Sequence, residues 1–107
     1  MATAALTTPA LLFSRRQTMA RYASALLAYG QREQALDWAR RAFTVPAEDV
    51  RSQVIATAVL AEALAATGGR AAARASAEET VRLAYATEQR SERRAADDLL
   101  ARLAAAD

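Results

Sequence analysis

The side chains that most often perform catalysis or bind metal ions are largely missing from this chain of 107 residues. It contains no histidine, cysteine or lysine, so the commonest general base, the thiolate and imidazole metal ligands and the amine of Schiff-base chemistry are all excluded. Sequence neighbours on a helix point in different directions, so adjacent carboxylates do not form an acid and base that share a site. The closest carboxylate pairs are all of this kind: Glu48 with Asp49, Glu78 with Glu79, and Asp97 with Asp98. We therefore expect no enzymatic activity, no metal site and no cofactor.

Arginine supplies all the side-chain positive charge, 14 residues against 12 acidic residues, for a net charge of +2. Three arginine pairs are sequence neighbours: Arg15 with Arg16, Arg40 with Arg41, and Arg93 with Arg94. Such a pair can bind phosphate or an acidic peptide, or it can be solvated helix surface beside Asp and Glu. The pI of about 9.7 reflects a small excess of arginine and not a strong field. We therefore expect no direct binding to nucleic acid.

The composition also indicates where the protein acts. A chain without cysteine suits a reducing interior, and no apolar run approaches the roughly 20 residues that span a bilayer. Alanine- and arginine-rich, lysine-free usage is typical of GC-rich bacterial coding sequences. We expect a cytoplasmic bacterial protein that does not bind membranes, with residues 1–8 as a flexible start.

The elements that carry these side chains follow from an internal repeat with a shift of 38 residues. Residues 25–43 and 63–81 align without a gap. The identical pairs are Ala25 and Ala63, Leu26 and Leu64, Ala28 and Ala66, Gly30 and Gly68, Arg32 and Arg70, Ala35 and Ala73, and Ala39 and Ala77. A fixed period of this length is typical of helical repeat arrays, in which each unit buries its apolar face by stacking on the next. The repeat therefore predicts an all-α fold.

Glycine and proline mark the ends of the helices in the first repeat. A first helix over residues 9–29 has Pro9 in its first turn and ends at Gly30, because glycine suits the left-handed position just past a helix end. A second helix over residues 32–43 stops before Pro46.

The second repeat is predicted to open with Pro46 in the first turn of a third helix, which ends before Gly68. A fourth helix follows that glycine. Residues 82–95 contain neither glycine nor proline, so its end is open. The chain either breaks between residues 85 and 91, with a fifth helix over residues 92–105, or continues as one long helix. The repeat period favours the break.

These elements predict a single domain over residues 1–107, in which residues 9–45 form repeat one, residues 46–86 form repeat two and residues 91–106 form a capping helix. The capping helix has apolar residues on one face and charged residues elsewhere, which is typical of a helix that covers the open end of an array. Its apolar residues are Ala96, Leu99, Leu100 and Leu103.

The small residues around the predicted turns resemble those of a tetratricopeptide (TPR) repeat. In that family a small residue lies on the first helix, a glycine ends it, two alanines follow on the second helix, and a proline often opens the next repeat. The matching residues are Ala23, Gly30, Ala35, Ala42 and Pro46 in repeat one, and Ala61, Gly68 and Ala73 in repeat two. Thr80 stands where a further alanine is expected, and the period exceeds the usual value of about 34 residues. The resemblance covers residues 16–85 and implies antiparallel helical hairpins stacked as a short TPR-like α-solenoid of about two repeats.

The resemblance also implies a binding groove, because the first helices of TPR-like hairpins line a concave face that receives a peptide or a partner helix. The free face of these helices carries Gln17, Ala20, Ser24 and Leu27 in repeat one, and Ile55, Ala58 and Glu62 in repeat two. The leading hypothesis is a non-catalytic protein–protein interaction module that binds another protein or peptide. The alternative function is an oligomerisation or sensor domain of a bacterial transcription regulator. The alternative to an open groove is that residues 1–12 or the second subunit of a homodimer cover this face.

Two further expectations concern packing. Ala35 and Ala73 are predicted to occupy equivalent positions where two helices approach closely. Trp38, Tyr29 and Tyr85 are either contact residues for a partner or partly buried packing.

Overall fold

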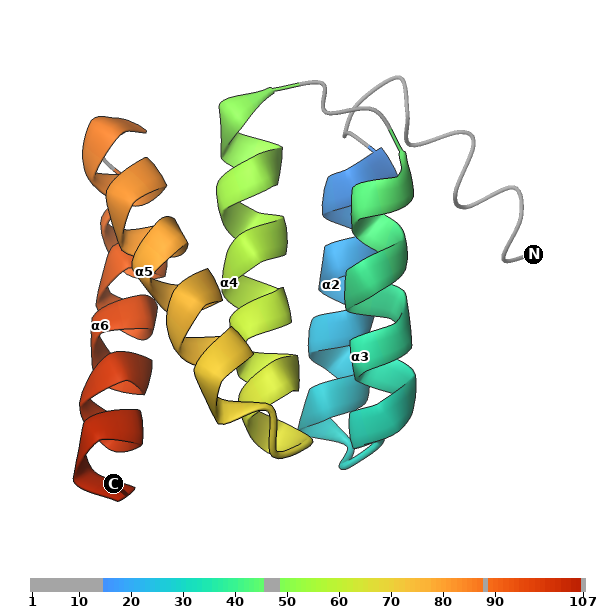
Figure 1. Ribbon diagram of the computed structural model, residues 1–107. Coiled ribbons are helices and arrows are strands. Elements are labelled where there is room, and N and C mark those ends of the chain that lie inside the picture. Colours follow the sequence, from blue (N-terminus) through green and yellow to red (C-terminus); the bar gives the residue numbers. More distant parts are fainter. Residues whose placement is uncertain (1–14, 46–48, 88, 107) are drawn as a thin grey trace.

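The computed structural model describes residues 15–45, 49–87 and 89–106, and nearly all of these residues are helical (Figure 1). The helices are α2 (Arg15–Ala28), α3 (Arg32–Arg41), α4 (Val50–Ala66), α5 (Arg70–Thr87) and α6 (Arg90–Ala106), and a short 3₁₀ turn, η2 (Ala42–Thr44), continues α3. No strand occurs within these ranges. The all-α prediction is confirmed.

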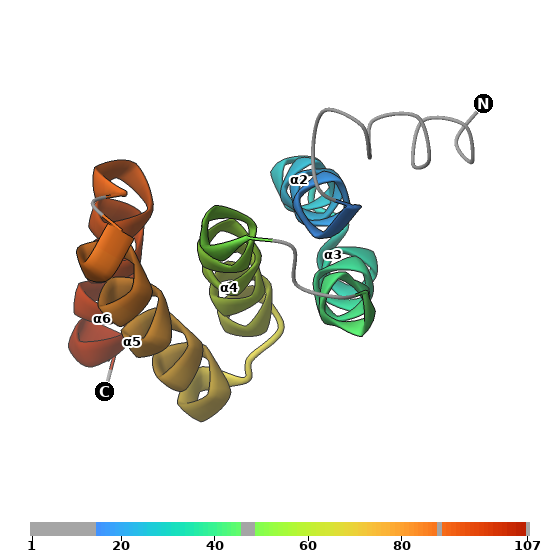
Figure 2. The same cartoon turned by 90° about the horizontal axis from the view of Figure 1, so that it is seen from above.

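The helices alternate in direction, so that α2, α4 and α6 run one way and α3 and α5 run the other (Figure 1). Viewed from above, α4 lies between the hairpin of α2 and α3 on one side and the pair α5 and α6 on the other (Figure 2). It contacts all four of these helices. Because α4 is central, any groove between the first hairpin and the last helix has α4 at its base.

The two glycine turns adopt the same conformation, as the repeat predicts. Gly30 and Gly68 have φ of 80° and 90°, a left-handed conformation that glycine adopts at little cost. In the first turn the Gln31 amide donates to the Leu26 carbonyl at 2.8 Å, and in the second the Gly69 amide donates to the Leu64 carbonyl at 2.8 Å. Each turn thereby satisfies carbonyls that the helix end leaves without partners.

The predicted helix ends are accurate to within a few residues. The predicted start at Pro9 and the proline at residue 46 lie outside the described residues. The first turn of α4 differs from the prediction, because Asp49 is its N-cap and accepts a hydrogen bond from the Ser52 amide at 2.6 Å. The predicted break after α5 is confirmed and the single long helix is wrong, since α5 ends at Thr87 and α6 begins at Arg90.

Alanines related by the 38-residue shift are buried at equivalent positions in both hairpins. Each pair exposes 1% or less of its surface: Ala23 and Ala61, Ala35 and Ala73, Ala39 and Ala77. Small side chains at these positions let the two helices of each hairpin approach closely. The predicted equivalence of Ala35 and Ala73 is confirmed.

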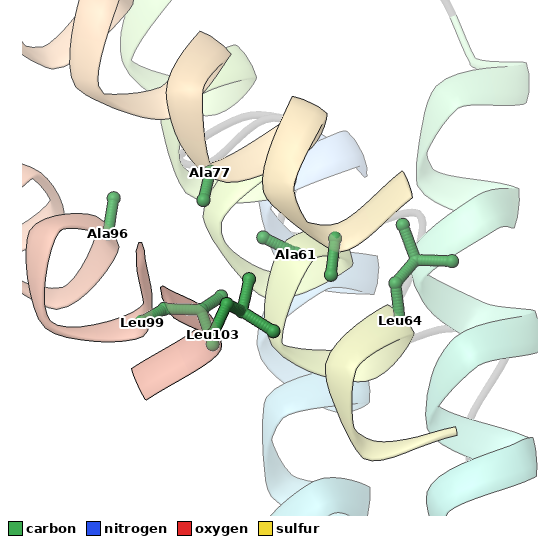
Figure 3. Close-up of a cluster of buried hydrophobic side chains, with 7 residues drawn as sticks. Ala61, Leu64, Ala77, Ala96, Leu99 and Leu103 are labelled. Carbon is green, nitrogen blue, oxygen red and sulfur yellow. The ribbon is translucent and has the colours of Figure 1, made fainter. Parts of the chain in front are cut away.

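The last helix contributes its apolar stripe to the largest buried cluster (Figure 3). The cluster consists of Ala61, Leu64, Ala73, Ala77, Ala96, Leu99 and Leu103. It joins α4, α5 and α6, with Leu99 only 2% exposed. The apolar face of α6 therefore packs against the second hairpin, and its fourth predicted member, Leu100, is only partly buried.

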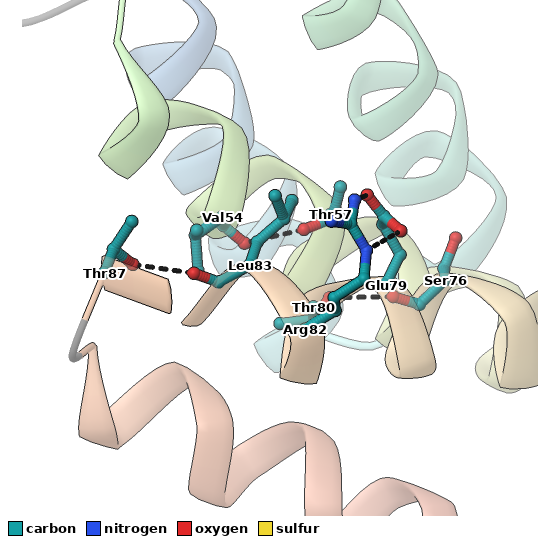
Figure 4. A network of polar contacts seen from close by, with 8 residues as sticks. All are labelled: Val54, Thr57, Ser76, Glu79, Thr80, Arg82, Leu83 and Thr87. Carbon is teal, nitrogen blue, oxygen red and sulfur yellow. Dashed lines mark hydrogen bonds and ion pairs between the residues drawn. The ribbon is translucent and has the colours of Figure 1, made fainter. Parts of the chain in front are cut away.

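Thr80, the residue that departs from the alanine pattern, is fully buried. Its hydroxyl donates a hydrogen bond of 2.8 Å to the Ser76 carbonyl one turn earlier in α5 (Figure 4). The hydroxyl of Thr57 is likewise bonded to the Val54 carbonyl at 3.0 Å in α4. Because each buried hydroxyl finds a partner within its own helix, threonine is accommodated in the apolar contact.

Candidate functional site

A small apolar cavity of about 200 Å³ lies where α2, α4 and α6 face one another. Helix α4 provides its floor, α2 one wall and α6 the other. The lining residues are Ser24, Leu27, Ala58, Val59, Ala61, Glu62, Ala95, Ala96 and Leu99. Most of these side chains are small, so the cavity results from three helices that meet without large residues between them.

A second depression of about 320 Å³ continues the first toward the N-terminal ends of the same helices. It is lined by Arg21, Arg51, Ile55, Ala58, Val59, Ser91 and Glu92. Ala58 and Val59 belong to both hollows, which therefore join. We call the joined surface the α4 groove; from Arg51 to Glu62 it extends about 16 Å at the helical rise per residue.

Four of the seven predicted contact residues line the apolar cavity together: Ser24, Leu27, Ala58 and Glu62. Ser24 is exposed, and the other three are half-buried. Ile55 lines the neighbouring depression, but only 8% of its surface is exposed. The structure thus brings together the C-terminal half of the predicted α2 face and the predicted α4 face.

Gln17 and Ala20 do not belong to an open surface, which corrects their predicted role. Ala20 is fully buried in a cluster with Met19, Ala42, Ile55 and Ala56. Gln17 is 8% exposed and lies against Ser52 of α4, with 3.5 Å between its amide oxygen and the Ser52 hydroxyl oxygen. The reason is that this part of α2 packs directly against α4, so the face predicted to be free is used in the contact between the hairpins.

The sequence patterns do not indicate the α6 side of the groove or its charged mouth. Ala95, Ala96 and Leu99 form the α6 wall, although the pattern of this helix predicts only that Ala96 and Leu99 cover the second repeat. Arg21 and Arg51 lie on α2 and α4 at the N-terminal end of the groove. One signal for this mouth is Arg51, a basic residue in the first turn of a helix, where positive charge is disfavoured.

The charges around the groove differ between its two ends. At the C-terminal end of α4, Glu62 forms an ion pair with Arg102 of α6 at 3.0 Å. At the N-terminal end, the Glu92 carboxylate accepts a hydrogen bond from the neighbouring Ser91 hydroxyl. Among the described residues, no carboxylate lies within ion-pair distance of Arg21 or Arg51. One end is therefore neutralised internally. At the other end the lining has two arginines and one acid, and the Asp49 carboxylate that caps α4 lies at the same helix end.

The arginine pairs contain one residue with a structural role. Arg16 is 7% exposed, and its guanidinium donates to the carbonyls of Ala42 and Val45 at 2.8 and 2.7 Å. It also lies 4.9 Å from the centre of the Phe43 ring. Phosphate binding by Arg16 is therefore excluded as an interpretation, because its hydrogen-bonding groups hold the end of the first hairpin.

Two further members of these pairs, Arg41 and Arg93, contact side chains on their own or a neighbouring helix. Arg41 forms an ion pair with Asp37 at 3.0 Å and stacks 4.9 Å from the Trp38 ring. Arg93 lies 4.1 Å from the centre of the Tyr85 ring. These are contacts of exposed side chains, which contribute little to stability.

The aromatic residues lie away from the groove lining. Tyr22 and Trp38 pack edge to face with ring centres 5.0 Å apart, and Trp38 is half-buried. Tyr29, beside the first glycine turn, is 84% exposed.

One carboxylate outside the groove has a shifted pKa. On α5, side-chain hydrogen bonds from Arg82 lower the pKa of Glu79, and the charge of that cation lowers it further (Figure 4).

A family match, a curated relative and a similar solved structure were each sought by comparison, and none was found for this chain. Within residues 15–45, 49–87 and 89–106, no helix combines the length and apolar character of a membrane span. The same ranges contain no cluster of three or more acidic side chains that could hold a metal ion. The geometry of the α4 groove is therefore the basis for any functional proposal.

Proposed function

We propose that this protein is a non-catalytic interaction module whose α4 groove binds a peptide or a helix of another protein. One observation carries the proposal: side chains from α2, α4 and α6 line a single apolar hollow that meets solvent at Ser24, Leu27 and Glu62. Concave, mostly apolar hollows with a few polar groups at their edges are typical binding sites.

The proposal includes a TPR-like arrangement of the hairpins. Equivalent left-handed glycines at residues 30 and 68, and equivalent buried alanines at residues 35 and 73, support it. The groove lies along the first helix of each hairpin and along α6, which is the side that receives ligands in TPR-like arrays.

The size of the groove favours a short ligand and weak binding. Stable protein interfaces bury about 800 Å² on each partner, which a groove about 16 Å long does not provide. Small side chains dominate the walls, so few groups can act as strong anchors. We expect a dissociation constant in the micromolar range or weaker, about −8 kcal/mol or less in magnitude.

The first prediction tests the groove with peptides selected from a displayed library of random amphipathic helices. Leu27→Arg combined with Ala58→Arg should weaken binding of the best selected peptide about tenfold or more, because both arginines fill the hollow with charge. Fluorescence anisotropy measures the affinity. Ser24→Arg, on the exposed rim, is a milder variant that should show the same direction of change without affecting the fold.

The matched control places two arginines on the exposed face of α5, Ala72→Arg with Ala75→Arg. This variant adds the same charge and should bind the peptide as the parent chain does. Circular dichroism confirms that each variant is folded. If the groove variants and the control bind the selected peptide equally, the groove is not the binding site.

A further inference from the structure

The apolar hollow of the α4 groove has room for one large side chain. Its volume is about 200 Å³, and cavities of about 150 Å³ lined by apolar residues accept a benzene ring. Four alanines contribute to the lining, so a partner backbone can approach closely. They are Ala58, Ala61, Ala95 and Ala96. A single leucine or phenylalanine side chain is the ligand group that fits.

The N-terminal end of the groove has a positive field with two sources. Arg21 and Arg51 line it, and within the described ranges no carboxylate pairs with either. The N-terminal ends of α4 and α6 also meet here, since Arg51 lies in the first turn of α4 and Ser91 in the first turn of α6. Helix N-termini carry partial positive charge, which adds to that of the arginines. Two carboxylates oppose this field in part: Glu92 in the lining and Asp49, which caps α4.

The opposite end of the groove lacks such a field. Glu62 and Arg102 neutralise each other across it. Because α2, α4 and α6 run in the same direction, the groove has a positive N-terminal end and a C-terminal end where helix carbonyls are partly negative (Figure 1). A partner helix is favoured when its own C-terminal end lies at the positive end, antiparallel to α4.

The distance between the hollow and the two arginines sets the spacing expected between the apolar and the acidic residue of the ligand. Along α4, Arg51 lies nine residues before the centre of the hollow near residue 60, about 13 Å at the helical rise per residue. Along α2, Arg21 lies about 7 Å before the midpoint of Ser24 and Leu27, so the two arginines are on average about 10 Å from the hollow along the helices. On a partner helix this distance corresponds to two turns, or seven residues on one face. An acidic residue at that distance from the apolar anchor would meet Arg21 and Arg51.

From these features, and resting on the proposed function, we infer the class of partner that the α4 groove selects. It is an amphipathic helix with one large apolar residue at position i and a carboxylate at position i+7. The apolar residue enters the hollow formed by Leu27, Ala58 and Leu99. The carboxylate binds the two arginines, and the helix lies antiparallel to α4.

The test uses synthetic, fluorescently labelled helical peptides of about 18 residues with one leucine anchor. They differ only in whether position i+7 is glutamate, glutamine or lysine, and a fourth peptide carries its glutamate at i−7. We expect the i+7 glutamate peptide to bind about five- to tenfold tighter than the glutamine peptide, with the lysine and i−7 peptides no better than glutamine. The preference should decrease as salt is raised.

Variants of the protein test whether Arg21 and Arg51 cause the preference for the i+7 glutamate peptide. Arg21→Gln with Arg51→Gln should remove the preference, so that the glutamate and glutamine peptides bind this variant equally. Glu92→Gln should strengthen binding of the glutamate peptide. Arg40→Gln, an exposed arginine on α3 outside the groove, is the matched control and should change neither affinity. Replacing an arginine in the first turn of α4 does not threaten the fold, since a cation there is unfavourable.

Failure of the inference is distinguishable from failure of the proposed function. If glutamate and glutamine peptides bind equally and Leu27→Arg abolishes both, the groove binds helices and the charge preference is wrong. If no peptide binds, or if Leu27→Arg leaves binding unchanged, both proposals are wrong. If sedimentation shows a dimer that Leu27→Arg dissociates, the groove is occupied by a second copy and the inferred partner is wrong.

Discussion

Arg16 is the most consequential single side chain that sequence patterns did not assign. An arginine is rarely buried without partners, and here its guanidinium donates to two backbone carbonyls beyond the end of α3. These carbonyls, at Ala42 and Val45, lie where a helix end leaves acceptors unsatisfied. Arg16 therefore ties the start of α2 to the end of the first hairpin, much as a capping residue does.

The residue-scale prediction is that Arg16→Met lowers the free energy of unfolding by about 1 to 3 kcal/mol, because the buried carbonyls lose their donor. Methionine retains most of the aliphatic stem, so lost packing contributes little. Urea denaturation followed by circular dichroism measures the change. Arg40→Met removes the same charge from the exposed face of α3 and should shift stability by less than about 0.5 kcal/mol. Similar losses for both variants would mean that charge, and not the carbonyl bonds, matters.

At the scale of elements, the helical hairpins depend on two features that recur 38 residues apart. Left-handed glycines reverse the chain, and buried alanines allow the helices to pack closely after the turn. Ala35 and Ala73 follow their turns at the same distance, and their amides donate to the carbonyls of Gln31 and Gly69 at 2.9 and 2.8 Å. The contacts after each turn are thus the same in both hairpins.

The corresponding prediction is that Ala35→Leu destabilises the protein by about 1 to 3 kcal/mol, because three extra carbon atoms have no space between α2 and α3. Ala73→Leu should have a similar effect in the second hairpin. Ala75→Leu is the control, since Ala75 is an exposed residue on α5, and it should be nearly neutral. Thermal unfolding of the three variants measures the change in melting temperature. Equal changes for Ala35→Leu and Ala75→Leu would contradict the assignment of Ala35 to a close helix contact.

At the scale of the whole molecule, α6 contributes to both stability and the groove. It buries Leu99 and Leu103 against the second hairpin, and it supplies one wall of the apolar hollow. Leu99 belongs both to the buried cluster and to the wall of the hollow. Stability at this end of the fold and the shape of the groove are therefore coupled through one side chain.

We predict that Leu99→Ala lowers the free energy of unfolding by about 2 to 5 kcal/mol, because it leaves a cavity between α4, α5 and α6. Amide hydrogen exchange should accelerate most in α5 and α6. Leu100→Ala, at the neighbouring half-buried position, should cost clearly less. If the two alanine variants are equally stable, the assignment of Leu99 to the main cluster is wrong.

The features that the sequence determines by itself are mainly local. A glycine just past an apolar periodic segment predicts a left-handed turn whatever surrounds it, and Gly30 and Gly68 both adopt one. The 38-residue shift predicts which alanines are equivalent, because one hairpin packs in the same way each time it occurs. The break after residue 87 follows from the same period, but the start of α6 is two residues earlier than predicted because no glycine or proline marks it.

The tertiary structure alone decides which helix faces remain open. Gln17 and Ala20 have the same spacing as the groove residues, yet they are buried because α2 packs against α4 near its N-terminal end. Likewise α6 becomes a groove wall, although its own pattern indicates only an amphipathic helix. The physical reason is that periodicity defines an apolar stripe within one helix, whereas the rotation and crossing of neighbouring helices depend on how side chains from separate segments interlock.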